Sequence, residues 1–344
     1  MNILFDINHP AHVHLFRNAI AVLKSRGHQV TITARDKDVT LALLDAYKLS
    51  YICLSKAQKG IWKLGGELLH RQWKLIPILR RQKIQVCVSA TGACSVHICK
   101  LLGIPALVFY DTEHAQLQNM LTVPFATRFI TPGSFKKRYG KNHLTYNGIH
   151  DLAYLHPSYF TPDTGISARL GLQANEKFVL MRFVSWEAAH DIGKKRMSLE
   201  FKKKLIDLCA RYARVFIISE SPLNGAFEAF RLSVSPEKIL DVLNIATLYI
   251  GDGGSMATEA AVLGTPSVFV SSLTAGVFDE LEKNYGLMRT FTPDQEETIL
   301  QAVEKILKDP DVKSTWRTKQ KKFLDDKINV TDYFFETILK YAKN

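Results

Sequence analysis

Short apolar runs alternate with amphipathic helical patterns along this chain, and this alternation constrains the fold more than any other feature. Such a pattern favours βα units whose strands form parallel sheets. In the first half, the predicted strands are 2–7, 29–34, 51–54, 85–90, 106–110 and, as the last one, 128–131. The predicted helices of this half are 12–26, 39–49, 60–82 and 93–102. Pro77 should kink or split the third of these helices.

The pattern restarts after residues 145–163, which we interpret as a linker because this stretch is rich in turn-forming residues. The predicted strands of the second half are 178–184, 215–219, 248–250 and 267–270. Its predicted helices are 198–212, 236–246, 256–263, 293–307 and 332–342. We therefore predict an α/β protein with two Rossmann-like, doubly wound parallel-sheet domains, residues 1–150 and 165–322, which face a cleft.

Composition narrows the class of protein further. The length of 344 residues fits two domains, and 47% hydrophobic with 23% charged residues excludes disordered chains and disulfide scaffolds. Lys and Arg number 45 against 33 Asp and Glu, and the net charge of +12 favours an anionic partner. No nucleic-acid-binding motif is visible, so we expect no nucleic acid partner. Five cysteines without metal-site spacing, and no signal or membrane-spanning segment, indicate a soluble cytoplasmic protein.

The strongest local signal is the segment IGDGGSMATEAAVLGTPSVF, residues 250–269. A predicted strand ends at Ile250, and a helix starts near Ser255 after a glycine-rich turn. Glycines let a ligand approach the backbone, and a helix N-terminus offers N–H groups with partial positive charge, so this loop should hold a phosphate. Glu259 lies one helical turn after Ser255, within reach of a ribose diol. The alternative is a tight βα turn with a solvated Glu259.

A second polar cluster lies between the first strand and the first helix and contains Asp6, His9, His12 and His14. The helix dipole keeps a histidine at a helix start neutral, as a general base must be at neutral pH. We therefore expect His12 to matter most for turnover, and His14 to point elsewhere. The alternative is a metal site, but Asp6 is the sole carboxylate of this cluster, and we expect no metal.

Further candidate groups follow other predicted strands. Asp111, Glu113 and His114 come directly after the strand 106–110, where catalytic groups of open sheets collect. A polar loop with a helix cap is the alternative interpretation of this cluster. The candidates of the second half are Arg182, Ser185, His190 and Ser219. Ser219 belongs to a loop that we expect beside the base of a bound nucleotide.

Residues 56–83 combine basic and aromatic side chains with a single acid, Glu67. Trp62 and Trp73 lie among the apolar residues of this stretch. Two interpretations remain open here. One is a core-packed helix with a basic outer face, and the other is a helix that lies on an anionic bilayer.

These motifs resemble a known family. Residues 6–14, DINHPAHVH, are similar to the D-x-x-H-P-A-H-x-H start of a poorly characterised family of GT-B-like proteins, known mainly as a domain of unknown function. The resemblance covers essentially the whole chain. Residues 250–269 are similar to the donor-nucleotide loop of GT-B glycosyltransferases and of UDP-N-acetylglucosamine 2-epimerases. This similarity implies that the diphosphate contacts Gly253, Gly254, Ser255 and Met256, and that Glu259 binds the ribose.

The resemblance also implies an architecture and a reaction. It implies a first domain that binds the acceptor, a second that binds the nucleotide sugar, and a C-terminal helix, 325–344, that packs back on the first. The implied enzyme is a metal-independent glycosyltransferase with a nucleoside diphosphate sugar as donor, uridine being the expected base, and with no other cofactor. His12, Asp111 or Glu113 would deprotonate the acceptor, for which we consider a lipid-linked molecule at the inner face of the membrane.

Two other functions stay open at this point. The first is a 2-epimerase-like enzyme, in which Glu113 is the counterpart of a catalytic acid. The epimerases carry an H-R-R-E-N loop where this chain has residues 181–191, MRFVSWEAAHD, and this departure disfavours the epimerase interpretation. The second is a non-catalytic nucleotide-sugar-binding protein.

Overall fold

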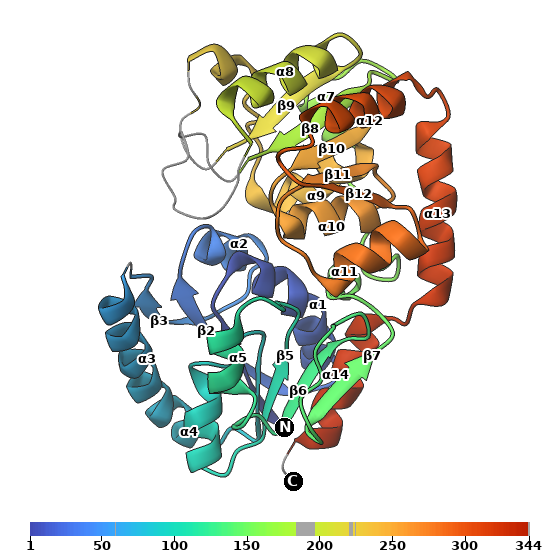
Figure 1. Ribbon diagram of the computed structural model, residues 1–344. Helices are drawn as coiled ribbons and strands as arrows, with labels where there is room; N and C mark the ends of the chain where they lie inside the picture. Colours follow the sequence, from blue (N-terminus) through green and yellow to red (C-terminus); the bar gives the residue numbers. More distant parts are fainter. Residues whose placement is uncertain (59, 184–196, 220–222, 224, 343–344) are drawn as a thin grey trace. The chain divides into compact units, whose positions relative to one another are not determined.

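The computed structural model describes residues 1–58, 60–183, 197–219, 223 and 225–342. The chain forms two compact units, one of Met1–Phe160 with Lys327–Asn344 and one of Thr161–Asp326 (Figure 1). Each unit is built on an open parallel sheet with helical crossovers. The predicted α/β class with two doubly wound sheets is therefore confirmed.

The sheet of the first unit has seven strands within the described residues, in the order β3-β2-β1-β4-β5-β6-β7. Its strands are β1 (Asn2–Ile7), β2 (Gln29–Asp36), β3 (Ile52–Lys56), β4 (Val86–Ser89), β5 (Ala106–Phe109), β6 (Arg128–Pro132) and β7 (His143–Tyr146). The chain first adds strands on one side of β1 and then returns to add β4 on the other side. The carboxyl ends of β1 and β4 therefore flank a topological switch point, where open α/β sheets bind ligands.

Helices cover both faces of this sheet. They are α1 (Pro10–Ser25), α2 (Thr40–Ala46), α3 (Ile61–Arg81), α4 (Ser95–Leu101), α5 (Gln116–Thr122), α6 (Leu152–Leu155) and α14 (Val330–Tyr341). Right-handed crossovers put α1 and α2 on one face and α3, α4 and α5 on the other. The Phe334 ring of α14 lies 4.0 Å from that of Phe109 and 6.2 Å from that of Phe16, measured between centroids. The C-terminal helix therefore returns to the first unit, as predicted.

Several elements of the first unit differ from the prediction. Residues 128–131 are not the last strand, because β7 extends the sheet and pairs Tyr146 with Pro132. The expected linker 145–163 thus begins inside a strand, and it also contains α6. The β7 sequence His-Leu-Thr-Tyr is too short and too polar to stand out as an apolar run. Helix α3 runs unbroken through Pro77, whose ring is exposed.

The second unit has a five-stranded parallel sheet in its described part, in the order β12-β11-β10-β8-β9. Its strands are β8 (Phe178–Arg182), β9 (Arg214–Ile218), β10 (Leu248–Gly251), β11 (Ser267–Val270) and β12 (Met288–Phe291). Strand β8 pairs with both β9 and β10, so the switch point of this sheet lies between β8 and β10. Arg182 and Gly251 are register partners there.

The helices of the second unit are α7 (Ile166–Arg169), α8 (Leu199–Ala210), α9 (Ile239–Ile245), α10 (Gly254–Val262), α11 (Gly276–Asp279), α12 (Glu296–Lys308) and α13 (Val312–Asp326). The sequence analysis predicted neither β12 nor α13. Most α13 side chains are polar, and few of them are buried, so this helix shows no clear apolar periodicity. No helix in the described ranges has the length and apolar character needed to cross a membrane.

Candidate active site

The first candidate region is the loop that joins β1 to α1 at the switch point of the first sheet. Helix α1 begins at Pro10, two residues earlier than predicted, and proline suits this position because it needs no N–H partner there. His9 is the N-cap residue, and its Nδ1 accepts the Ala11 N–H at 3.3 Å. His12 is therefore the third residue of the helix, and its ring centroid lies 6.0 Å from that of His9.

His12 is buried, and its ring is held in one orientation. The main-chain N–H of Asn8 donates to Nδ1 of His12 at 3.2 Å. Burial lowers the pKa of the His12 imidazole well below its usual range, and the nearby His9 and His150 rings lower this pKa further. The ring is thus neutral near pH 7, and its proton lies on Nε2 because Nδ1 accepts a hydrogen bond. In this state His12 offers a ligand a hydrogen-bond donor.

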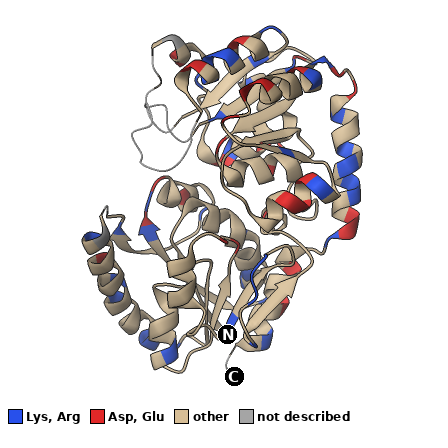
Figure 2. Cartoon of the chain, viewed as in Figure 1, with Lys and Arg blue, Asp and Glu red and all other residues tan. Residues whose placement is uncertain are grey.

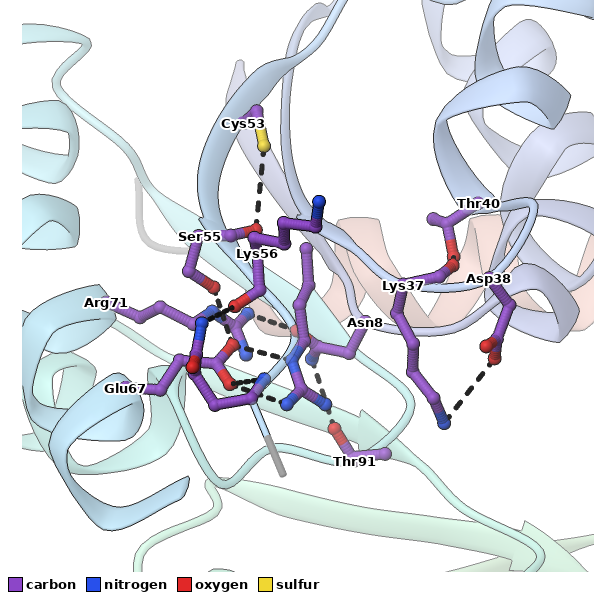
Figure 3. A network of polar contacts seen from close by, with 12 residues as sticks. Asn8, Lys37, Asp38, Thr40, Cys53, Ser55, Lys56, Glu67, Arg71 and Thr91 are labelled. Atoms are coloured by element: carbon purple, nitrogen blue, oxygen red, sulfur yellow. Dashed lines mark hydrogen bonds and ion pairs between the residues drawn. The ribbon is translucent and has the colours of Figure 1, made fainter. Parts of the chain in front are cut away.

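A buried polar network fixes the main chain that holds His12, and Figure 3 shows the part of it that joins Asn8, Arg71 and Thr91. Asp6, at 0% exposure, accepts hydrogen bonds from Thr33 Oγ1 and Arg71 Nη2, each at 3.0 Å, and from Asn8 Nδ2 at 3.2 Å. Arg71 also donates to Oδ1 of Asn8, and Asn8 Nδ2 donates to Thr91 Oγ1 at 3.1 Å. Buried networks of this kind make a loop rigid, although Arg71 Nε is buried without a hydrogen-bond partner among the described residues. The sequence analysis did not select Asn8 or Arg71.

A second ion pair links α3, the helix that carries Arg71, to the sheet. Glu67, one turn before Arg71 on α3, accepts two hydrogen bonds from Arg35, each at 2.6 Å. Burial raises the pKa of Glu67, but the hydrogen bonds from Arg35, Ser55 and the Gln58 N–H outweigh it and hold the pKa at about 2. Glu67 and Arg71 therefore fix which face of α3 meets the sheet.

His14 is a core residue and not part of this polar cluster. Its Nδ1 lies 3.4 Å from the Tyr47 hydroxyl, and its ring packs against the ring of Tyr154. Burial lowers the pKa of His14 to about 3. In the part of the chain that the structure describes, no group of three or more His, Cys, Asp or Glu side chains is arranged to hold a metal ion.

The loop after β5 adds carboxylates to the same edge of the first sheet. Asp111 and His114 are exposed, and Glu113 is half-buried. Thr112 Oγ1 donates to Asp111 Oδ1 at 3.1 Å. The negative charge of Asp111 acts on the buried ring of His150, so these two side chains lie near each other.

His150 is a candidate that the sequence analysis missed. Its Nδ1 lies 2.5 Å from the Tyr146 hydroxyl, and its ring packs edge-on against Phe334 of the C-terminal helix. Burial lowers the pKa of His150, and Asp111 partly offsets this effect. His150 lies in the turn after β7, which ends at Tyr146, so recognition of that strand would have placed it at the sheet edge with His12 and Asp111.

In the second unit, the β10–α10 turn forms the second candidate region. Helix α10 has Gly253 as its N-cap, and none of the described side chains caps it. Its first N–H groups are therefore available to an anion. The glycines of this turn are also required by packing. A Cβ at position 254 would lie 2.8 Å from the Phe278 ring, and one at position 251 would overlap the Tyr249 hydroxyl.

Charged side chains gather around this turn. Arg182, Asp252 and Glu259 all act electrostatically on the buried Tyr249, whose pKa is raised chiefly by burial. Ser255 is exposed, Met256 is half-buried and Glu259 is buried. Ser219 follows β9 directly, so it lies at the same edge of the sheet as Arg182. The remaining candidates, Ser185 and His190, lie outside the described residues.

Comparison with known proteins identifies the family. A model of the family described as "Protein of unknown function (DUF354)" matches residues 1–343. The chain belongs to the DUF354 family. An uncharacterized protein of Methanocaldococcus jannaschii is 24% identical over 281 residues, which are 78% of this chain and 81% of the relative. This assignment agrees with the resemblance carried by residues 6–14.

Solved structures show which fold this DUF354 member has. It is similar to UDP-GlcNAc 2-epimerase from Neisseria meningitidis bound to UDP-GlcNAc, with a TM-score of 0.68, 12% identity and coverage of 99% and 100% of the two chains. It is also similar to MnaA of S. aureus in complex with UDP (TM-score 0.70, 10% identity, 99% and 96% covered). The glycotransferase of kitacinnamycin aligns with a TM-score of 0.63, 14% identity and coverage of 99% of both chains. The fold is therefore GT-B-like.

Proposed function

We propose that this DUF354 member is a glycosyltransferase of the GT-B type whose donor is a sugar linked to uridine diphosphate. The observation that carries the proposal is the uncapped start of α10 at a switch point, with Arg182 on the neighbouring strand and Glu259 in the second turn. The similar epimerase structure holds UDP-GlcNAc, and the similar MnaA structure holds UDP.

In this proposal, the second unit stabilises the negative charge of the leaving diphosphate. The N–H groups of Gly254, Ser255 and Met256 and the guanidinium of Arg182 stabilise that charge, so the reaction needs no metal. The carboxylate of Glu259 accepts hydrogen bonds from the ribose hydroxyls. Ser219 lies beside the base.

The acceptor side belongs to the first unit. A sugar is transferred when the acceptor hydroxyl loses its proton and its oxygen bonds to the anomeric carbon while the diphosphate leaves. Asp111 or Glu113 takes the proton, and the Nε2–H of His12 holds a substrate oxygen in place. His12 can act as the base only if its Nδ1 gives up the Asn8 hydrogen bond or its proton moves from Nε2. The acceptor in this proposal is lipid-linked and lies at the cytoplasmic face of a membrane.

An epimerase-like reaction is the second candidate, because the epimerase structure matches this chain with a TM-score of 0.68, against 0.63 for the kitacinnamycin glycotransferase. Such an enzyme moves a proton at C2 of the donor sugar and needs acid and base groups on both sides of that carbon. Asp111 and Glu113 would supply them.

A panel of uridine, thymidine, guanosine and cytidine diphosphate sugars, each followed by NMR, tests the proposal. A transferase releases the nucleoside diphosphate, quickly with an acceptor and slowly by hydrolysis without one. An epimerase converts the donor sugar without release, and a binding protein changes nothing but its melting temperature. Release of UDP supports the proposal, and either of the other two results overturns it.

A further inference from the structure

Helix α3 exposes an aromatic and aliphatic face that the fold itself does not use. Trp62 is 91% exposed, Trp73 is 79% exposed, and Leu69 between them is 68% exposed. Contiguous exposed apolar side chains mark interaction surfaces far more often than single ones do. At 100° per residue, spacings of seven and four residues place these three side chains within about 40° of one another around the helix. We call them the tryptophan stripe.

A row of basic side chains runs beside the tryptophan stripe. Lys63, His70, Lys74 and Arg81 follow Trp62, Leu69, Trp73 and Arg80 by one residue each, and all four, like Arg80, are exposed. Lys74 Nζ donates to the main-chain oxygen of Leu54 at 3.1 Å, so the outward cations of this row are Lys63, Arg80 and Arg81. Figure 2 shows the Lys and Arg positions along this helix. The single acid of residues 56–110 is Glu67, which is bound to Arg35 on the opposite face. The exposed surface of α3 is therefore apolar along one line and positive along the next.

The orientation of this face is fixed by the rest of the helix. Glu67, Arg71, Leu75 and Leu79 recur every fourth residue, and all four are buried. The two ion pairs of Glu67 and Arg71 hold that inner row against the sheet. The helix therefore has a complete core face already, and the tryptophan stripe has no place in the core.

An anionic bilayer surface fits this face better than a protein does. Tryptophan prefers the membrane interface, where its ring meets the acyl boundary and its N–H meets water. Lysine and arginine beside it attract anionic headgroups. A second copy of this chain would set one positive row against another in a symmetric contact, and like charges oppose that pairing.

We propose that the tryptophan stripe and its cationic row dock the protein on an anionic membrane surface, with α3 lying in the plane of the interface. The proposal is independent of the reaction, because none of these side chains belongs to the candidate active site.

Flotation of the full chain with vesicles tests the proposal. Vesicles of phosphatidylcholine with phosphatidylglycerol should bind the protein, vesicles of phosphatidylcholine alone should not, and added salt should weaken binding. Trp62→Ser/Trp73→Ser should abolish flotation. Lys63→Gln/Arg81→Gln should weaken binding to these vesicles about 25-fold, because each cation near an anionic surface contributes about fivefold in affinity. The matched control, Lys321→Gln/Lys322→Gln, removes two exposed cations of α13 and should leave binding unchanged.

All the substituted positions are exposed, so the melting temperature of each variant should equal that of the unaltered protein. A lower melting temperature would therefore reveal a variant that misfolds. Equal binding to both vesicle types, no binding to either, or loss of binding in the α13 control would overturn the proposal. So would a tryptophan-dependent dimer in analytical ultracentrifugation, because the face would then be covered by a second copy. Flotation without any sugar transfer would leave this proposal intact and remove the proposed function.

Discussion

The main-chain N–H of Asn8 donates a hydrogen bond to Nδ1 of His12 across 3.2 Å, and this contact decides what His12 can do. A neutral imidazole whose Nδ1 accepts a hydrogen bond carries its proton on Nε2. The side chain of Asn8 is itself held by hydrogen bonds to Asp6 and from Arg71. The tautomer of His12 is therefore set by a buried network and not by the ligand. His12 is thereby prepared to donate a hydrogen bond.

The first prediction separates a donor from a base at His12. Glutamine can place an amide N–H near the position of Nε2–H, but it cannot take up a proton at neutral pH. We therefore expect His12→Gln to retain turnover within about tenfold, whereas His12→Ala loses about 10²–10³-fold, as for removal of one transition-state donor. Steady-state rates of nucleoside diphosphate release measure both. If Gln and Ala were equally inactive, His12 would be the base.

A second prediction concerns acid stability and His14. Its pKa is 6.5 in an unfolded chain and about 3 in the folded protein, so below pH 6.5 the unfolded state binds the extra proton. The contribution of His14 to the free energy of unfolding is therefore fully present above pH 6.5. It falls with decreasing pH, by about 2 kcal/mol at pH 5. His14→Phe removes this loss. Urea unfolding of both proteins at pH 7.5 and pH 5 checks it, and equal pH dependence in the two would contradict the assignment.

A third prediction tests the Asp6–Arg71 pair. Arg71→Leu leaves the fully buried carboxylate of Asp6 without its cation, which should lower the free energy of unfolding by about 3–5 kcal/mol. The control is Arg80→Leu on the exposed face of the same helix, with an expected change within about 0.5 kcal/mol. Chemical denaturation measures both variants. Similar values for the two would show that Arg71 does not compensate Asp6.

A fourth prediction contrasts two glycines. A Cβ at Gly251 would overlap the Tyr249 hydroxyl and lie 2.6 Å from the Arg182 carbonyl oxygen, so Gly251→Ala should cost about 1–3 kcal/mol of stability. Gly66 lies inside α3 with open space around it, and Gly66→Ala should add about 0.5–1 kcal/mol. Thermal unfolding distinguishes them by sign. A neutral Gly251→Ala would mean that packing does not require this glycine.

The sequence was sufficient for the fold wherever burial produced an apolar pattern. Strands such as β1 and β10 are buried along nearly their whole length, and they appear as continuous apolar runs. β7 and β12 lie at sheet edges, where shorter and more polar strands are tolerated, and the pattern did not reveal them. Pro77 was expected to break α3, but it lies on the exposed side of that helix.

For the candidate site, the sequence indicated the loops but not the contacts between them. His12, Asp111 and the glycine turn follow recognisable strands, so their places at the sheet edges were predictable. Arg71 comes from the middle of a helix 65 residues after Asp6, and His150 depends on a strand that was not recognised. Pairings over such separations depend on tertiary packing, which no local pattern encodes.

Titration of UDP into the protein and into Glu259→Ala, with a chelator present, tests the central claim most directly. Loss of a charge-assisted hydrogen bond to the ribose should reduce the affinity by about 1.5–3 kcal/mol, which is about 13- to 160-fold. Glu297→Ala, which removes an exposed carboxylate of α12, should bind UDP like the unaltered protein. The account predicts metal-independent UDP binding that depends on Glu259. Unaltered affinity in Glu259→Ala, or no binding of UDP at all, would contradict it.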